Sequence, residues 1–138
     1  SNQSGPSAIP PYTIPAGVQN FAIVANVTMP QPLNNAHFSL TACGRTTSNG
    51  WQGYEGLENG GQAQIFANSN ELAQTDFNPG TGPHTYRLEV RGNVITLYID
   101  NALVVQATDN TFLPCGSQVG MVSSQAIVHV SSFQVIRL

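Results

Sequence analysis

The stretch from Tyr86 to Val105 constrains the fold more than any other part of this chain. Apolar side chains occupy every second position from Tyr86 to Val90 and again from Ile95 to Ile99, which is the period of a strand with one buried face. Gly92-Asn93 interrupts the first run. Asp100-Asn101 ends the second, and this pair tolerates the positive φ of a tight hairpin turn. The stretch therefore predicts consecutive antiparallel strands and an all-β scaffold.

Shorter runs of the same kind fill the rest of the chain. Strands are predicted over 21–28, 36–43, 51–57, 63–67, 71–76, 118–123, 127–130 and 133–138. Gly-rich breaks such as Asn59-Gly60-Gly61 and the Asn78–Pro83 loop separate them. Short strands spaced by roughly 8–12 residues, with no helical period, are typical of a β-sandwich.

The chain has 138 residues, a length that favours one domain with a substantial core. Residues 1–15 are rich in Ser and Pro and are interpreted as a leader or linker to a covalently attached neighbouring domain, with Tyr12 and Ile14 able to dock as an edge strand. Residues 16–138 are predicted to form the sandwich.

The charge and the length of the apolar runs argue against two classes of partner. Only 8% of residues are charged, the net charge is −3, and the chain has no lysine, so it offers no basic stripe for nucleic acid. No apolar run approaches the ~20 residues that a membrane-spanning helix needs. We therefore expect neither nucleic-acid binding nor membrane insertion by this segment.

Cys43 and Cys115 are the only cysteines, and the surface is supplied by Ser, Thr, Asn and Gln. This usage favours one disulfide and an extracellular or cell-surface location. The bridge would close a loop of about 70 residues and contribute about 4 kcal/mol through chain entropy. Two buried free thiols are the alternative.

Three stretches resemble the concanavalin A-like lectin/glucanase superfamily, in particular laminin-G-like modules and the sandwich domains found beside bacterial glycosidases, including fructan-binding modules. They are Phe21 to Arg45, Tyr86 to Asn101, and Asp109 to Val135. One departure is that Asn101 or Ala102 stands where the turn glycine is usual. The likeness implies a jelly-roll sandwich of two antiparallel sheets, with glycans bound on the concave sheet or at the loop rim and with calcium at the rim in many members.

A sugar-binding site is predicted around the segment from Arg45 to Glu58. Sugars need an aromatic face for their C–H patches and planar polar groups for their hydroxyls, and this segment carries both kinds. Core anchoring is the alternative role for the aromatic residues, and an ion pair with a glutamate is the alternative for Arg45. A polar row on the 86–91 strand is either a solvated sheet face or a groove floor. The predicted ligand-binding residues are Arg45, Trp51, Tyr54, Glu55, Glu58 and Arg87.

Catalytic and metal chemistry find little support. Glu55 and Glu58 are three apart and would face opposite sides of a strand, whereas a retaining glycosidase needs two carboxyls about 5 Å apart. Oxygen donors at Asp76, Asp100 and Asp109 lie near loops, but no compact Asp-x-Asp-x-Asp sequence exists. We expect no cofactor, with calcium as the open alternative.

These observations favour a non-catalytic, extracytoplasmic module of a larger protein that binds a glycan or a cell-wall polysaccharide. Two alternatives remain. One is a ligand-sensing or protein-interaction ectodomain of a bacterial receptor, such as a membrane-anchored kinase. The other is a glycoside hydrolase.

Overall fold

A computed structural model describes residues 2–3, 7–8, 12–15, 17–31, 33, 36–125 and 128–138. These residues form strands and no helix. Within these ranges there is therefore no helix that is long and apolar enough to cross a membrane. The strands are β1 (Asn2–Gln3), β2 (Ser7–Ala8), β3 (Tyr12–Thr13), β4 (Asn20–Met29), β5 (His37–Thr47), β6 (Gly50–Glu58), β7 (Gln62–Ala67), β8 (Asn70–Asp76), β9 (Gly82–Arg91), β10 (Val94–Ile99), β11 (Ala102–Thr108), β12 (Gln118–Ser124) and β13 (Val128–Arg137).

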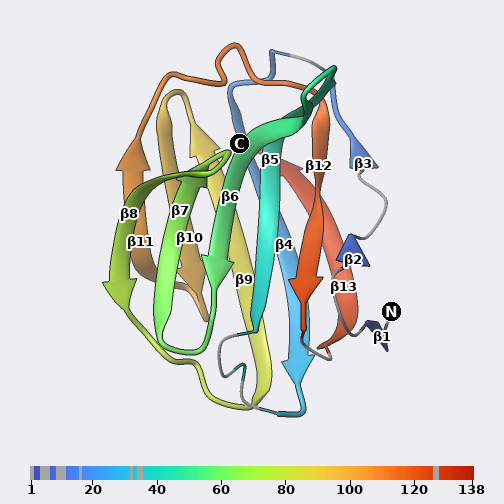
Figure 1. Ribbon diagram of the computed structural model, residues 1–138, viewed down its shortest axis with the longest axis vertical. Helices are drawn as coiled ribbons and strands as arrows, with labels where there is room; N and C mark the ends of the chain where they lie inside the picture. Colours follow the sequence, from blue (N-terminus) through green and yellow to red (C-terminus); the bar gives the residue numbers. More distant parts are fainter. Residues whose placement is uncertain are drawn as a thin grey trace.

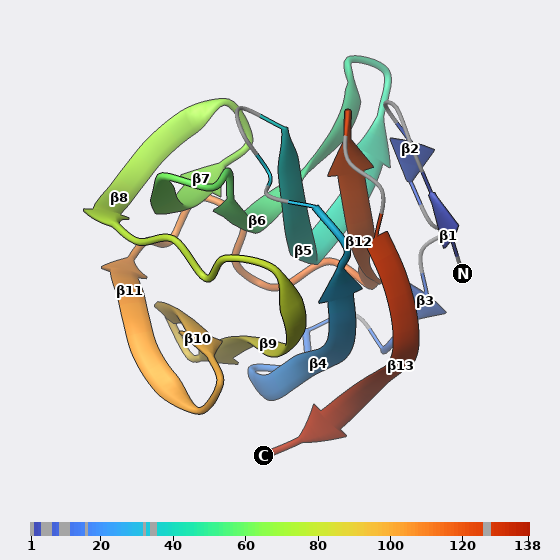
Figure 2. The same ribbon diagram turned by 90° about the horizontal axis from the view of Figure 1, so that it is seen from below.

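The strands make two antiparallel sheets that lie one over the other (Figures 1 and 2). Sheet A has the order β1-β13-β4-β9-β10-β11. Sheet B has the order β2-β12-β5-β6-β7-β8, and β3 also pairs with β12. From β4 onward the chain passes between the sheets after β4, β8, β11 and β12, as a jelly roll does, and the predicted all-β sandwich is confirmed.

The stretch that most constrains the fold forms β9, β10 and β11, as predicted. Tyr86 pairs with Ile99 and Leu88 with Leu97, so the alternating apolar side chains share one buried face. Asp100 and Asn101 adopt φ of 54° and 68° at the second turn. These are the left-handed values that a two-residue hairpin requires, and Asp and Asn tolerate them.

The ends of the chain differ from expectation in two respects, the first being that β1 pairs with β13 and β2 with β12. The two strands predicted after residue 126 are one strand, β13, with an irregularity in its pairing to β4 between Val130 and Ser132; residue 127, where the first was expected to begin, lies outside the described residues. The expected docking of Tyr12 is observed, because β3 pairs with β12. The interpretation of residues 1–15 as a leader falls partly outside the described residues and stays a prediction.

The core fills the space between the inner faces of the sheets. Phe38 of sheet B meets Tyr86 of sheet A edge to face, with ring centroids 5.1 Å apart. The sheets approach closely at Gly56, where a Cβ would lie 2.9 Å from Cδ1 of Leu88. The largest fully buried side chains include Phe21, Ile23, Leu40, Tyr54, Ile65, Leu88, Ile95 and Leu97.

A buried tyrosine holds the crossover loop that links β11 to β12 (residues 109–117). The Tyr54 hydroxyl donates to Asp109 Oδ2 at 2.9 Å and accepts from the Phe112 N–H at 3.2 Å. The Tyr54 and Phe112 rings meet edge to face at 5.4 Å. Burial raises the pKa of Tyr54 to about 12, so the phenol stays protonated as a donor at physiological pH.

The same crossover loop is fixed by a disulfide and an arginine. Cys43 of β5 is bonded to Cys115, with Cα atoms 4.4 Å apart, which confirms the predicted disulfide. Arg45 Nη2 donates to the carbonyl oxygens of Phe112 and Pro114 at 2.9 and 3.0 Å. The loop passes so close to β5 that a Cβ at Gly116 would lie 2.9 Å from the Cys43 carbonyl oxygen.

One carboxyl group is buried in the core. Glu58 ends β6 on its inner face, is 0% exposed, and accepts through Oε1 from the Gly60 N–H. Its Oε2 and the Tyr86 hydroxyl are buried without a hydrogen-bond partner among the described residues. Burial raises the pKa of Glu58 to about 7, because the charged form loses its hydration.

Removing the contacts of the crossover loop should destabilise the fold. We expect Cys43→Ala/Cys115→Ala to lower the free energy of unfolding by about 4 kcal/mol. Tyr54→Phe should lower it by about 1–3 kcal/mol because the buried Phe112 N–H loses its acceptor and the Asp109 carboxylate loses one of its donors. Urea denaturation measures both, with Tyr98→Phe on the outer face of sheet A as the control. Equal midpoints for Tyr54→Phe and Tyr98→Phe would contradict this role for the phenol.

The buried carboxyl makes stability depend on pH. Below pH 4.5, Glu58 is protonated in both folded and unfolded chains; between pH 4.5 and about 7 only the unfolded chain ionises, so stability falls as pH rises. The loss is on the order of 3 kcal/mol. Glu58→Gln should reduce the difference in unfolding free energy between pH 4.5 and pH 8 by that amount, measured by denaturation at both pH values. Glu71→Gln, which removes an exposed charge, should leave the difference nearly unchanged.

Candidate functional site

Strand β6 divides the predicted site residues between its two faces. Tyr54 and Glu58 point inward and are fully buried, where they serve the crossover loop and the core. Trp51 and Glu55 fall on the other face by the two-residue period and are half-buried. The segment therefore brings Trp51 and Glu55, but not Tyr54 and Glu58, to the outer face of sheet B.

Trp51 lies over two glycines. A Cβ at Gly44 would lie 2.5 Å from Trp51 Nε1, and one at Gly53 would lie 2.7 Å from Trp51 Cζ2. The indole therefore occupies the space that side chains at these two positions would fill. The edge of the indole that carries Nε1 and Cζ2 thus lies against bare backbone, and the side chain as a whole is half-buried.

A row of side chains crosses sheet B beside this indole. Thr41 of β5 pairs with Glu55 of β6, Glu55 pairs with Phe66 of β7, and Phe66 pairs with Glu71 of β8. Neighbouring strands lie about 4.8 Å apart, so Phe66 has one carboxylate on each side. The row combines an aromatic ring with strong hydrogen-bond acceptors.

Hydrogen bonds position both carboxylates of this row. Ser39 Oγ donates to Glu55 Oε2 at 2.5 Å, and Gln64 Nε2 donates to Glu71 Oε2 at 2.5 Å. Ser39 and Gln64 belong to the next row of the same face. The face thus presents acceptors and amides in fixed places, which is what the recognition of hydroxyl groups requires.

Sequence reasoning missed Phe66 and Glu71 as members of this face. The signal for Phe66 was present, because Ala63, Ile65 and Ala67 alternate with Gln62, Gln64 and Phe66. That alternation places Phe66 outside the core despite its apolar ring. Glu71 was harder to find, since its place opposite Phe66 depends on an irregularity in the β7–β8 pairing between Ile65 and Phe66.

Arg45 lies away from this face, at the rim of the sandwich. Besides holding the crossover loop, its guanidinium carbon lies 5.8 Å from the centroid of the Phe112 ring. Gly17, Arg45 and residues 114–117 surround a shallow depression of about 460 Å³. The ion pair with Glu55 or Glu58 that was the alternative role for Arg45 is not among the ion pairs of the described residues.

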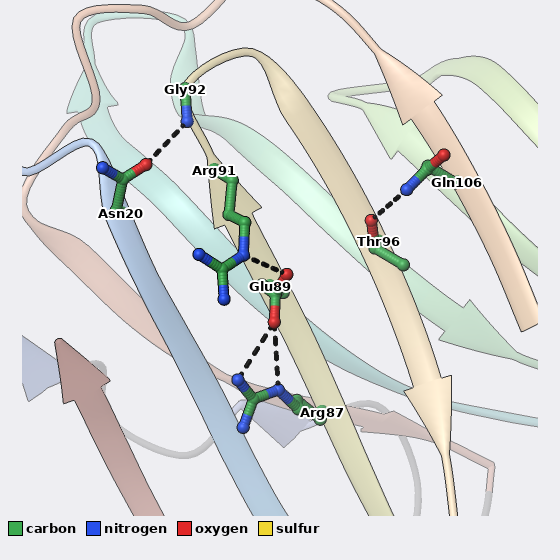
Figure 3. A network of polar contacts seen from close by, with 7 residues as sticks. All are labelled: Asn20, Arg87, Glu89, Arg91, Gly92, Thr96 and Gln106. Carbon is green, nitrogen blue, oxygen red and sulfur yellow. Dashed lines mark hydrogen bonds and ion pairs between the residues drawn. The ribbon is translucent and has the colours of Figure 1, made fainter. Parts of the chain in front are cut away.

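Arg87 lies on the outer face of sheet A, in a network of polar side chains (Figure 3). Glu89 accepts from Arg87 Nη2 at 3.0 Å and from Arg91 Nε at 2.7 Å. Burial raises the pKa of Glu89, but the hydrogen bonds from Arg91 and Arg87 outweigh it and hold the pKa below its ordinary value. Arg87 is thus engaged on the opposite side of the molecule from Trp51.

The oxygen donors considered for calcium do not gather in one place. Asp100 and Asp109 flank β11 at its two ends. Asp100 is bound to His84 at 2.7 Å and Asp109 to Tyr54. Across the described ranges, no group of three or more His, Cys, Asp and Glu side chains is arranged to hold a metal ion. These side chains do not fit a calcium site of the usual six to eight oxygens.

A glycosidase pair is not formed by the two glutamates of β6. Glu55 lies on the outer face and Glu58 in the core, as the three-residue spacing predicted. The outer face of sheet B carries groups suited to ring stacking and to hydrogen bonding with hydroxyl or amino groups.

No protein-family model matches the sequence, and no curated protein matches it. Solved structures do resemble it. The carbohydrate-binding module CBM66 from Bacillus subtilis superposes with a TM-score of 0.75 over 97% of this chain and 83% of that chain, at 16% identity. A Bacillus subtilis protein of unknown function with a galectin-like fold gives 0.73 over 94% and 76%, at 11% identity. Sheep galectin-11, in complex with glycerol, gives 0.62 over 97% and 99%, at 12% identity.

These likenesses agree with the sandwich of two antiparallel sheets described above. The chain therefore has the concanavalin A-like jelly-roll β-sandwich fold.

Proposed function

We propose that this chain is a non-catalytic carbohydrate-binding module that works outside the cytoplasm and binds glycans on the outer face of sheet B. The observation that carries the proposal is the indole of Trp51, supported from below by Gly44 and Gly53 and set on the same strand face as Glu55. Phe66 extends the aromatic surface across the sheet.

Physical chemistry favours a sugar over other ligands for this face. Aromatic rings pack against the C–H patches of a pyranose, while carboxylate and amide groups bind its hydroxyls. Trp51 and Phe66 supply the first kind of contact, and Glu55 and Gln64 supply the second. The likeness to CBM66 and to galectin-11, whose names describe carbohydrate recognition in the first case and a lectin in the second, supports the same choice.

The location and the absence of catalysis rest on separate grounds. A disulfide persists in oxidising compartments, which favours a secreted or surface protein. The two glutamates of β6 face opposite sides of the sheet, which disfavours acid–base hydrolysis. In this proposal the module is joined to a larger protein through the Ser- and Pro-rich residues 1–15, of which β1, β2 and β3 pair with the sandwich.

Displacing the indole should abolish most of the affinity. We expect Trp51→Ala to weaken binding by about tenfold or more, because the stacking surface is lost. Gly44→Ala keeps the indole but forces it from its place, so it should weaken binding in the same direction. Calorimetric titration with neutral oligosaccharides found on a glycan array measures both.

Tyr98→Ala is the matched control, since it removes a half-buried aromatic ring from the outer face of sheet A. Unchanged affinity in both Trp51→Ala and Gly44→Ala would remove this face from the site. Recovery of shortened oligosaccharides after incubation would instead contradict the non-catalytic assignment.

A further inference from the structure

We propose that the outer face of sheet B selects glycans with free amino groups, such as glucosamine-containing polymers, over acetylated or uronic-acid glycans. This inference rests on the proposed function and names its substrate class. It follows from the sign of the charges on this face and from their placement around Phe66.

The carboxylates on the outer face of sheet B have no arginine among them, whereas Glu89 on the outer face of sheet A is paired with Arg87 and Arg91. Glu55, Glu71 and Asp76 lie on the outer face of sheet B, the last opposite Gln62. The chain has no lysine and four arginines. Arg87 and Arg91 lie on the outer face of sheet A, Arg137 ends β13 of that sheet, and Arg45 is held by the crossover loop.

In the part of the chain that the structure describes, no arginine therefore opposes the acidic side chains on the outer face of sheet B. The titratable nitrogen on this face, within the same ranges, belongs to His37 at the start of β5, paired with Ser124. A uronate or sulfated sugar would meet carboxylates there without a compensating cation. Like charges in contact repel, so this face disfavours anionic glycans.

The placement of two carboxylates suits an amino sugar in particular. Glu55 and Glu71 flank Phe66 at one strand spacing on each side. A sugar ring stacked on Phe66 brings its ring substituents over the neighbouring strands, where an ammonium group meets a carboxylate of either strand. Charge-assisted hydrogen bonds of this kind are stronger than those to a hydroxyl or an acetamide.

Anchoring of the carboxylates strengthens this argument. Ser39 and Gln64 each donate to one oxygen of Glu55 and Glu71 respectively. The two side chains are thus oriented before a ligand binds. They lose less conformational entropy on binding than two free glutamates would lose. Because the groups are partly exposed, each carboxylate should contribute a factor of roughly two to five in affinity, decreasing with salt.

The experiment compares three oligosaccharides of equal length: β-1,4-linked glucosamine, its fully N-acetylated form, and a galacturonate oligomer. Affinities are measured by calorimetry at pH 5.5, where the sugar amines are protonated, in low and in high salt. We expect the glucosamine oligomer to bind at least about fivefold more tightly than the acetylated one at low salt. The galacturonate oligomer should bind most weakly.

Single charge removals locate the effect. Glu71→Gln and Glu55→Gln should each reduce the preference for glucosamine, measured as the ratio of the affinities for the aminated and the acetylated oligomers, by roughly two- to fivefold. Asp100→Asn, which removes an exposed charge from the β10–β11 turn, is the control and should leave the preference unchanged. Thermal unfolding of each variant verifies that it is folded.

The outcomes separate this inference from the proposed function. Equal binding of the aminated and acetylated oligomers, with loss of both in Trp51→Ala, would overturn the amino-sugar preference and leave the glycan-binding proposal standing. Tighter binding of galacturonate, or equal competition by the simple polyamine spermine, would also overturn the preference. Failure of every oligosaccharide to bind would overturn both proposals.

Discussion

Side chains on one side of the β5–β6 pair fix the crossover loop (residues 109–117) that joins the two sheets, and the arrangement of the candidate site depends on this. Tyr54, Arg45 and the disulfide at Cys43 reach inward or toward the rim and fix residues 109–117. Trp51 and Glu55 lie on the outer side of the same two strands, away from the side chains that fix this loop. One pair of strands thus both closes the sandwich and carries the candidate binding face.

The fold could be predicted from the sequence because its strongest signals are local. The alternation through Tyr86–Val105 and the Asp100-Asn101 turn depend only on neighbours in the chain, and they gave the right strands and the right hairpin. The single strand β13 was split in the prediction because an irregularity near Ser131 breaks the period of two. Such an irregularity is set by pairing with β4, which is distant in sequence.

The candidate site was only partly predictable, for the same reason. Alternation along β6 already places Trp51 with Glu55 and apart from Tyr54, so this division was within reach of the sequence. The role of Arg45 was not, because its carbonyl partners lie 67 and 69 residues away. The contribution of Glu71 was equally hidden, since its position opposite Phe66 requires the register of β8.

The two glycines beneath Trp51 have a thermodynamic consequence. A tryptophan that rests on bare backbone has few rotamers open to it, so the entropy of fixing the ring is lost during folding and not during association. A ligand that stacks on such a ring meets a side chain that is already fixed. The protein then loses little conformational entropy on binding. The glycines at 44 and 53 therefore restrict the Trp51 side chain already in the folded protein.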